Sequence, residues 1–345
     1  NMERISVNAS GKYDVVIGRG LIGDSAGLIS PLLGSGRLAV ITDDNVKNFC
    51  LGALKASLES AGIPYEVFVI PYGESSKNMT TLGTALEFLA SHAFTRSDMI
   101  AALGGGVVGD LSGLCAAMYL RGIRYVQIPT TLLACVDSSV GGKCAVDLAA
   151  GKNLAGAFWQ PSLVICDPSL LSTLPDAEFA NGMAEVIKYG AGFDRKLFDM
   201  TLGNVRENPD PIIARCIKIK RDTVESDEFD RGERKKLNLG HTIGHAVEKC
   251  SRFSIPHGSA VSMGLYAIYK AYAAEEASVI KKALEANGLP VQIPYTADEL
   301  CSAALSDKKR NGDTVSLVLP GPIGSCRIEN VPVASLNGII AEALS

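Results

Sequence analysis

Residues 98–110 read Asp-Met-Ile-Ala-Ala-Leu-Gly-Gly-Gly-Val-Val-Gly-Asp, and this stretch decides the fold class. The apolar run at 98–103 predicts a buried strand. Gly104-Gly105-Gly106 ends that strand, and a second apolar run at 108–119 predicts a helix. A strand that passes through glycines directly into a helix is typical of doubly wound α/β domains.

The same alternation continues on both sides of this stretch. Further strands are predicted at 37–42, 65–70, 125–129 and 163–166, and further helices at 46–60 and 79–91. The strands are continuous apolar runs, which indicates that both faces of the sheet are buried. The pattern therefore predicts a mostly parallel sheet with helices on both sides.

The pattern changes after about Pro175. Helical spacing dominates there, and only 314–319 reads as a strand. We therefore expect an α/β domain over residues 1–175 and an all-α domain over residues 176–345. The helices expected in the second domain cover 177–189, 211–227, 234–249, 260–277, 279–287 and 298–305.

Composition excludes several classes of protein. The chain has 345 residues, of which 47% are hydrophobic and 20% charged, and its net charge is −4. No basic patch predicts nucleic-acid binding, and no apolar run is long enough to span a membrane. The nine cysteines are scattered without a Cys-x-x-Cys pair. With no export signal evident, they predict buried, reduced thiols in a cytoplasmic enzyme rather than a disulfide framework.

The glycine stretch also predicts an anion site. Gly104, Gly106 and Gly109 satisfy Gly-x-Gly-x-x-Gly, in which backbone N–H groups at a helix start hold a pyrophosphate. Asp43 ends an earlier strand and could accept hydrogen bonds from ribose hydroxyls. The pattern alone leaves a plain tight turn open as the alternative.

Three of the four histidines lie close together in sequence. His241 and His245 are four residues apart and share one face of a helix, and His257 follows after Pro256. Imidazole is the commonest protein ligand for a catalytic transition metal. Glu185 is the best acidic partner upstream. The spacing by itself favours His241 and His245 as a pair of ligands on one helix face.

Basic residues beside glycines predict a multiply anionic substrate. Lys143 follows Gly142, and Lys152 with Asn153 follows Gly151. Each could equally be a solvated surface charge. Together they suit a small molecule that carries phosphate and carboxylate groups. The other members of this set are Lys188, Lys220, Arg234 and Lys308-Lys309-Arg310.

In combination, these motifs resemble the 3-dehydroquinate synthase family of sugar-phosphate cyclases. The resemblance covers nearly the whole chain. The motifs that carry it are Thr42-Asp43-Asp44-Asn45-Val46, Pro71-Tyr72-Gly73-Glu74-Ser75-Ser76-Lys77, Gly104 to Asp110, Ile128 to Leu133, Val136 to Lys143, Gly151-Lys152-Asn153, Gly182 to Lys188, Arg234 to His245, His257-Gly258 and Asp307-Lys308-Lys309.

The resemblance implies an N-terminal Rossmann-like nucleotide-binding domain, a C-terminal all-α domain and an active site in the cleft between them. It also implies bound NAD and one divalent ion, zinc or cobalt. It assigns the metal ligands to Glu185, His241 and His257, and it gives His245 a role in substrate contact and proton handling. It implies NAD contacts from Asp43, Asn45, Glu74, Lys77, Gly105, Gly106, Val107, Gly109, Asp110, Thr130, Thr131, Asp137, Ser138, Lys143, Lys152, Leu170, Thr173 and Glu178.

The resemblance also implies a substrate-binding set and a homodimer in which Arg121 reaches a neighbouring subunit. Two positions depart from the family pattern, Ser259 and Cys144-Ala145. In that pattern neither position contacts a ligand directly. The substrate and catalytic set comprises Arg121, Asp137, Lys143, Lys152, Asn153, Lys188, Lys220, Arg234, Asn238, His245 and Lys309.

The implied activity is the conversion of 3-deoxy-D-arabino-heptulosonate 7-phosphate into 3-dehydroquinate and phosphate, a step of the shikimate pathway. Three alternatives stay open at this point. They are another sugar-phosphate cyclase such as 2-deoxy-scyllo-inosose synthase, a metal-dependent polyol dehydrogenase, and a non-catalytic NAD-binding protein.

Overall fold

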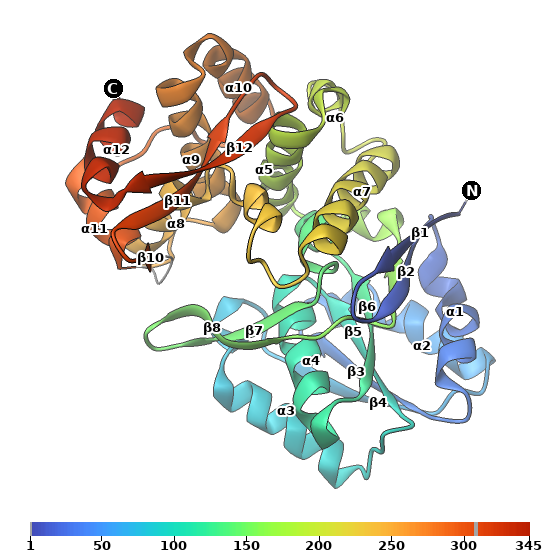
Figure 1. Ribbon diagram of the computed structural model, residues 1–345. Helices are drawn as coiled ribbons and strands as arrows, with labels where there is room; N and C mark the ends of the chain where they lie inside the picture. The colour runs from blue at the N-terminus through green and yellow to red at the C-terminus, as the bar shows by residue number, and fades with distance from the viewer. Residues whose placement is uncertain (1, 307–309) are drawn as a thin grey trace. The chain divides into compact units, whose positions relative to one another are not determined.

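The computed structural model describes residues 2–306 and 310–345 (Figure 1). Its contacts divide the chain into two compact units. Unit 1 runs to Pro175 and includes Lys220–Phe229, and unit 2 comprises Asp176–Ile219 and the chain from Asp230 onwards. A single cut after residue 175 does not account for residues 220–229, so the division into two uninterrupted domains stays a proposal.

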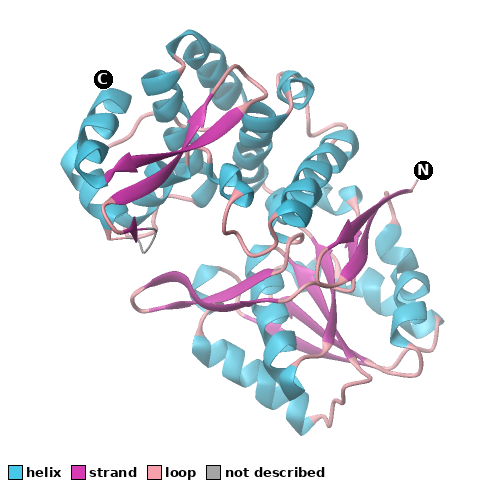
Figure 2. Ribbon diagram, viewed as in Figure 1, coloured by secondary structure: helices cyan, strands magenta, loops and turns pink. Residues whose placement is uncertain are grey.

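Unit 1 is built on one twisted sheet (Figure 2). The strand order is β1-β2-β9-β6-β5-β3-β4, in which β1 is antiparallel to β2 and the other neighbours are parallel. The strands are β1 (Glu3–Asn8), β2 (Lys12–Ile17), β3 (Leu38–Asp43), β4 (Tyr65–Ile70), β5 (Met99–Gly104), β6 (Arg124–Pro129) and β9 (Leu163–Cys166). The predicted α/β class is confirmed.

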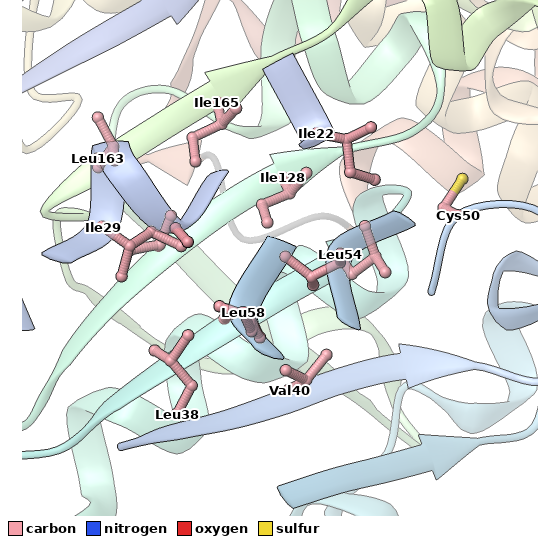
Figure 3. Close-up of a cluster of buried hydrophobic side chains, with 14 of the residues drawn as sticks. Ile22, Ile29, Leu38, Val40, Cys50, Leu54, Leu58, Ile128, Leu163 and Ile165 are labelled. Carbon is pink, nitrogen blue, oxygen red and sulfur yellow. The ribbon is translucent and has the colours of Figure 1, made fainter. Parts of the chain in front are cut away.

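Helices cover both faces of this sheet, as the apolar strands predicted. Along β3, Leu38 and Val40 pack toward α1 (Ser25–Leu33) and α2 (Leu51–Ser60), whereas Ala39 and Ile41 belong to the core on the opposite face. Figure 3 shows the first of these cores, with side chains of α1 and α2 over the strands. The second core holds side chains of α3 (Met79–Ser91) and α4 (Gly106–Met118). Alternate strand residues therefore face opposite helix layers.

Two hairpins of unit 1 were not predicted. One is β1 with β2, and the other is β7 (Lys143–Leu148) with β8 (Gly151–Phe158), a ribbon that packs on α4. In β1 and β8 few residues are buried, so their sequences lack the apolar runs that identified the central strands. The predicted helix at 46–60 is also shorter, because Val46–Asn48 forms a separate 3₁₀ turn before α2.

Glycines allow α4 to lie directly on the sheet. A Cβ on Gly109 would approach the Gln127 amide oxygen on β6 to 2.6 Å, and one on Gly104 would come 2.6 Å from Val108. Both distances are shorter than real Cβ contacts, so an added Cβ would force the Val108 side chain or the Gln127 amide to move. The start of α4 is thereby held at the carboxyl end of β5.

Unit 2 is mainly helical, as predicted, and it contains in addition an antiparallel sheet of β10, β11 and β12, of which only β11 was foreseen. Its helices are α5 (Asp176–Phe193), α6 (Arg195–Met200), the first part of α7 (Asp210–Ser226), α8 (His241–Cys250), α9 (His257–Tyr272), α10 (Ala274–Ala286), α11 (Ala297–Leu305) and α12 (Leu336–Leu344). The strands are β10 (Arg310–Asn311), β11 (Thr314–Pro320) and β12 (Cys326–Pro332).

Three predicted helices of unit 2 were wrong in their extent, and the one expected at 279–287 is α10, which already begins at Ala274. The helix expected at 234–249 is a 3₁₀ turn, Glu233–Asn238, followed by α8, because Gly240 adopts φ +76° and breaks the run. The helix expected at 260–277 begins at His257 and ends at Tyr272, where Ala273 is non-helical, and α10 then starts. Apolar periodicity continued through both breaks and concealed them.

Helices α8 and α9 cross in very close contact. A Cβ on Gly240 would lie 2.7 Å from the Leu265 nitrogen, one on Gly264 2.1 Å from the Gly240 oxygen, and one on Gly244 3.1 Å from the Ala260 oxygen. This glycine-lined crossing brings the start of α8, which carries His241, next to α9, which carries His257.

None of the nine cysteines, all of which lie within the described residues, forms a disulfide. This agrees with the expected thiols. Among residues 2–306 and 310–345, no helix combines the length and the apolar character that a membrane span requires.

Candidate metal centre and nucleotide site

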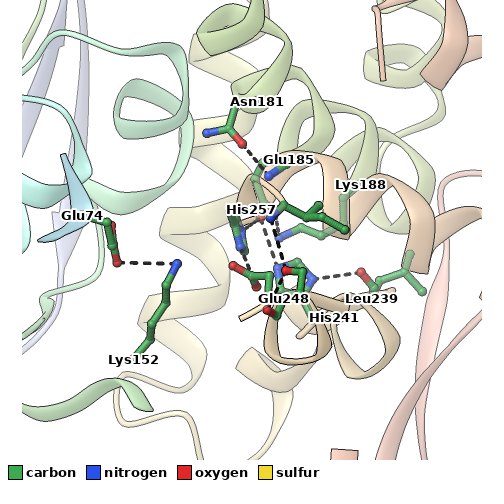
Figure 4. Close-up of polar contacts among 12 residues, drawn as sticks. Glu74, Lys152, Asn181, Glu185, Lys188, Leu239, His241, Glu248 and His257 are labelled. Carbon is green, nitrogen blue, oxygen red and sulfur yellow. Dashed lines mark hydrogen bonds and ion pairs between the residues drawn. The ribbon is translucent and has the colours of Figure 1, made fainter. Parts of the chain in front are cut away.

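Glu185, His241 and His257 converge in unit 2 (Figure 4). One carboxylate oxygen, Glu185 Oε1, lies 3.1 Å from His241 Nε2 and 2.9 Å from His257 Nε2. The three ligand atoms all lie within 4.8 Å of one another. Helix α5 supplies the carboxylate, α8 the first imidazole and α9 the second. Two nitrogens and a carboxylate oxygen are a donor set typical of catalytic zinc.

The orientation of His241 favours a cation between these groups. Its Nδ1 lies 3.1 Å from the carbonyl oxygen of Leu239, which can only accept a hydrogen bond. In the neutral ring the proton therefore sits on Nδ1, and the Nε2 lone pair faces Glu185. Burial lowers the pKa of His241, with Lys188 adding to the effect, which favours this neutral form. A lone pair that faces a carboxylate is stabilised by a shared metal ion.

His257 lies between two carboxylates. Its Nε2 faces Glu185, and its Nδ1 lies 3.2 Å from Glu248 Oε2. Burial alone would lower the pKa of His257, but hydrogen bonds to Glu185 and Glu248 outweigh it and raise this pKa to about 10 in the metal-free protein. Without metal, the protonated His257 ring supplies the positive charge that balances Glu185. A bound cation would supply that charge instead.

Glu185 stays ionised despite complete burial. Burial would raise its pKa, but Lys188, which contacts Glu185 Oε2, and the hydrogen bond from His257 hold the pKa well below its ordinary value. Lys188 is itself only 2% exposed. The carboxylate therefore has one oxygen on a lysine and the other directed at both imidazoles.

His245 lies beside the same cluster. Its ring centroid is 5.1 Å from that of His241 and 6.2 Å from that of His257. A second set of possible ligand atoms, from His245, Glu248 and His257, also lies within 4.8 Å. The approach of Glu185 to His241 and His257 fits the ligand set that the resemblance implies, and the separate role of His245 stays a prediction.

The predicted nucleotide residues of unit 1 gather at the carboxyl ends of the parallel strands. Strands β4 and β5 lie on opposite sides of β3, so the strand order reverses between β3 and β5. Ligands of open α/β sheets bind at such a reversal. Gly105 precedes the first turn of α4 and provides no side-chain cap, which leaves backbone N–H groups at this helix start available to an anion.

Asp43 at the end of β3 stabilises the turn after the strand, in addition to its predicted contact with ribose hydroxyls. Its Oδ1 accepts hydrogen bonds from the backbone N–H groups of Asn45 at 2.9 Å and Val46 at 2.7 Å. These bonds shape the turn after the strand. Because Oδ1 accepts both of these bonds, a ribose hydroxyl would bind Oδ2.

A charged cluster lies beside the glycine turn. Lys77 Nζ is 2.7 Å from Asp110 Oδ2 on α4 and 4.0 Å from Glu74 Oε1, and Lys152 Nζ is 3.7 Å from the same Glu74 oxygen. Burial raises the pKa of Asp110, and Lys77 opposes that shift. The cluster unites four residues of the predicted NAD set from three separate parts of the sequence.

The remaining predicted residues of unit 1 come from several separate segments. Asp137, in the single π-helical turn Ala134–Ser138, pairs with Lys220, so two predicted substrate contacts 83 positions apart meet. The Thr130 N–H donates to the Gly104 carbonyl at 3.0 Å, joining the ends of β5 and β6. The side chains of Thr131 and Ser138 lie next to Gly105 and Gly106 of the glycine turn. The backbone of Asn153 has φ +56°. Lys143 and Arg121 are exposed. Leu170 and Thr173 lie in the 3₁₀ segment Pro168–Thr173.

In unit 2, Arg234 is only 1% exposed, and it lies with Asn238 in the 3₁₀ turn before α8. Glu178 belongs to the first turn of α5, so it is in a different unit from the rest of the predicted NAD set. Lys309 lies outside the described residues. The expected placement of the active site between the domains stays a prediction.

Sequence reasoning missed two residues beside the metal cluster. Glu248 accepts from His257, and the Asn181 side chain accepts from the backbone N–H of Gly258 at the start of α9, which has no cap of its own (Figure 4). Glu248 had a detectable signal, since it follows His245 by three positions and His241 by seven on one helix face. Asn181 had an equivalent signal in its spacing of four from Glu185.

The chain is similar throughout its length to enzymes of one family. Residues 67–181 match the family described as 3-dehydroquinate synthase N-terminal, and residues 182–310 match 3-dehydroquinate synthase C-terminal. It is 40% identical to the 3-dehydroquinate synthase of Streptococcus suis over 340 residues, covering 94% of this chain and 95% of the relative. It is 44% identical to that of Clostridium acetobutylicum over 336 residues, covering 92% and 93%.

Solved structures share the fold. A 2-epi-5-epi-valiolone synthase from Streptomyces hygroscopicus subsp. jinggangensis 5008, with NAD+ and Zn2+ bound, superposes with a TM-score of 0.88 at 26% identity over 99% of both chains. A 2-deoxy-scyllo-inosose synthase complexed with carbaglucose-6-phosphate, NAD+ and Co2+ gives 0.88 at 23% identity over 99% of both chains. An iron-containing alcohol dehydrogenase gives 0.68 at 18% identity over 96% of this chain and 97% of its own.

Proposed function

The chain belongs to the 3-dehydroquinate synthase family, and from this we propose that it converts 3-deoxy-D-arabino-heptulosonate 7-phosphate into 3-dehydroquinate and inorganic phosphate. It is a lyase-type cyclase that acts on a small sugar phosphate. The observation that carries the proposal is the approach of Glu185 Oε1 to both His241 Nε2 and His257 Nε2, at 3.1 and 2.9 Å.

We propose that these three residues hold one divalent ion, zinc or cobalt. The fit rests on the donor chemistry described above, in which His241 presents a lone pair rather than a proton to Glu185. When bound, the ion would lower the pKa of substrate hydroxyls that reach it. Both imidazoles are already turned by hydrogen bonds on their Nδ1 atoms, so little reorientation would be needed to bind it.

We propose that unit 1 binds NAD, which would accept a hydride from the substrate and return it within one catalytic cycle. The support is the start of α4, which no side chain caps, and the close approach of Gly104 to Val108 and of Gly109 to the Gln127 side chain. The pair of Lys77 and Asp110 holds the first turns of α4 against the segment that follows β4. The solved cyclases with NAD+ and either Zn2+ or Co2+ bound are consistent with this pairing of cofactors.

The cationic residues supply the binding of an anionic substrate. Lys188 and Arg234 in unit 2 and Lys220 in unit 1 are each less than a tenth exposed, and such burial of positive charge is rare outside binding sites and ion pairs. Lys188 pairs with Glu185 and Lys220 with Asp137. Each lysine ammonium has three donors, so it can keep its carboxylate and still bind a substrate oxygen. His245, next to the metal cluster, is the side chain best placed to move a proton.

We further propose that the enzyme works in the cytoplasm as a homodimer. The thiol state of its cysteines suits a reducing compartment. Arg121 supports the dimer, because it is exposed and has φ +64°, in a corner where the preceding Leu120 also has φ +50°. Non-glycine residues seldom hold this conformation without a functional reason.

The test is to incubate the purified protein with the heptulosonate phosphate, zinc and a catalytic amount of NAD. Phosphate release and the product are followed by NMR, and NADH by absorbance at the same time. The proposal expects many turnovers per NAD with no net NADH. A polyol dehydrogenase would instead accumulate NADH in proportion to product. Failure to release phosphate from this substrate, with release from a sugar phosphate that lacks the carboxylate, would identify a different cyclase.

The ligand set has its own test. His257→Ala is expected to remove stoichiometric zinc and abolish turnover, whereas His92→Ala, at the end of α3 in unit 1, is expected to keep both. Normal turnover by zinc-free His257→Ala would refute the ligand assignment.

A further inference from the structure

We propose that Glu248 is a positioning residue for the metal centre, which acts by accepting the Nδ1–H of His257 and so directing the Nε2 lone pair at the ion. The inference rests on the proposed function only in requiring that Glu185, His241 and His257 bind a metal. It concerns a residue that the sequence motifs did not include.

The geometry of His257 carries the proposal. Glu248 Oε2 and Glu185 Oε1 lie on opposite nitrogens of the same ring, at 3.2 and 2.9 Å (Figure 4). A metal at Nε2 requires the proton on Nδ1, and Nδ1 then needs an acceptor. Glu248 is that acceptor. A carboxylate hydrogen-bonded to a metal-ligating imidazole fixes both the tautomer and the ring plane, and it raises the basicity of the ligand.

His257 is the ligand that most needs such an anchor. Its side chain is 29% exposed, compared with 7% for His241 and none for Glu185. It is also the first residue of α9, so no preceding helical turn packs against its ring. His241 is held by the Leu239 carbonyl of its own chain segment, a backbone group that cannot be mutated away. His257 depends instead on a side chain from another helix.

Helix α8 therefore has two functions at the centre. Its first residue is the ligand His241, and Glu248, seven residues later on the same face, holds the second histidine. Glu248 is 5% exposed, so its charge is poorly screened by water and its effect on the ring is strong. The close crossing of α8 with α9 fixes the distance between Glu248 and His257.

A competing interpretation is that Glu248 binds metal itself, since His245, Glu248 and His257 also form a possible ligand set. That arrangement would place an ion on His257 Nδ1; the fully buried Glu185, whose Oε1 faces both His257 Nε2 and His241 Nε2, favours the ion at Nε2 instead. The two interpretations differ in stoichiometry, because a positioning residue leaves one ion per chain.

The experiment measures zinc binding by competition with a chromophoric chelator in the full-length protein, alongside the visible spectrum of the cobalt-substituted form. The variants are Glu248→Ala and Glu248→Gln, and Glu285→Ala on the exposed face of α10 is the control. Glu248→Ala is expected to weaken zinc binding about 10–100-fold. Glu248→Gln still accepts the Nδ1–H without the charge, so a smaller loss is expected. Both should alter the cobalt spectrum, while the control should not.

The melting temperature of each metal-free variant separates positioning from a general loss of stability. The proposal is overturned if Glu248→Ala and Glu248→Gln bind zinc as tightly as the unmodified chain, or if only the metal-free stability changes. It is also overturned if the unmodified chain binds two ions and the variants one. If the unmodified chain binds no zinc, the proposed metal centre fails too, whereas unchanged variants of a zinc-binding protein refute this inference alone.

Discussion

Replacing Gly240 with alanine should destabilise unit 2 and impair the metal centre together. Gly240 has φ +76°, which costs an alanine about 1–2 kcal/mol. The added Cβ would also lie 2.7 Å from the Leu265 nitrogen and 2.8 Å from its Cα. These are backbone atoms of α9 that cannot rotate away, and overpacking of this kind costs about 1–3 kcal/mol more. We therefore expect a total loss of about 2–5 kcal/mol.

Gly288 offers a matched control in the same unit. It follows α10 with φ +73°, nearly the same backbone conformation, but a Cβ there would meet no atom within 4 Å. Gly288→Ala should therefore show only the conformational cost, about 1–2 kcal/mol. The difference between the two variants isolates the contact between α8 and α9.

The assay is urea denaturation of the metal-free proteins, followed by zinc titration of the folded variants. Because His241 directly follows Gly240 and His257 begins α9, a forced separation of the helices should weaken zinc binding in Gly240→Ala and leave Gly288→Ala unaffected. Equal losses of stability in the two variants, with equal zinc affinity, would show that the helix crossing does not position the ligands.

Three further predictions follow from other contacts. Arg234→Ala should weaken substrate binding by about 2–5 kcal/mol while leaving NAD affinity unchanged, as measured by calorimetry with Lys235→Ala as the control; equal effects on both ligands would remove Arg234 from the substrate site. Lys77→Met should destabilise unit 1 by about 3–5 kcal/mol in urea, because it leaves Asp110 buried without its ammonium. The raised pKa of that carboxyl means that the deficit should shrink as the pH falls, and a deficit that grows in acid would contradict the argument. Zinc must displace the proton of His257, whose metal-free pKa is about 10. Zinc affinity should therefore rise about tenfold per pH unit from neutrality toward that value. A zinc affinity that does not change with pH would mean that the ring is already neutral.

Much of the candidate site could be predicted because its residues carry local signals. Three consecutive glycines indicated the turn after β5. The clustering of three histidines in the sequence indicated the site on α8 and α9. The family resemblance then selected Glu185 and His257 over His245. Spacing could not make that choice, since it fixes the face of one helix but not which side chain of another helix meets it. Glu248 and Asn181 were missed for a related reason: their roles depend on contacts to α9 that their own helices do not reveal.

The amino-acid sequence by itself determined the alternation of strands and helices in unit 1, because buried strands between two helix layers must be apolar throughout, and that composition is visible residue by residue. It also determined the helical character of unit 2. Only the tertiary structure decided where the apolar periodicity is interrupted, as at Gly240, because a left-handed glycine costs little locally and is required only by the approach of α9. Only the tertiary structure brought Glu185 onto two imidazoles 56 and 72 positions away. Long-range convergence of this kind depends on how helices pack, and packing is set by side chains that are neighbours in space and not in sequence.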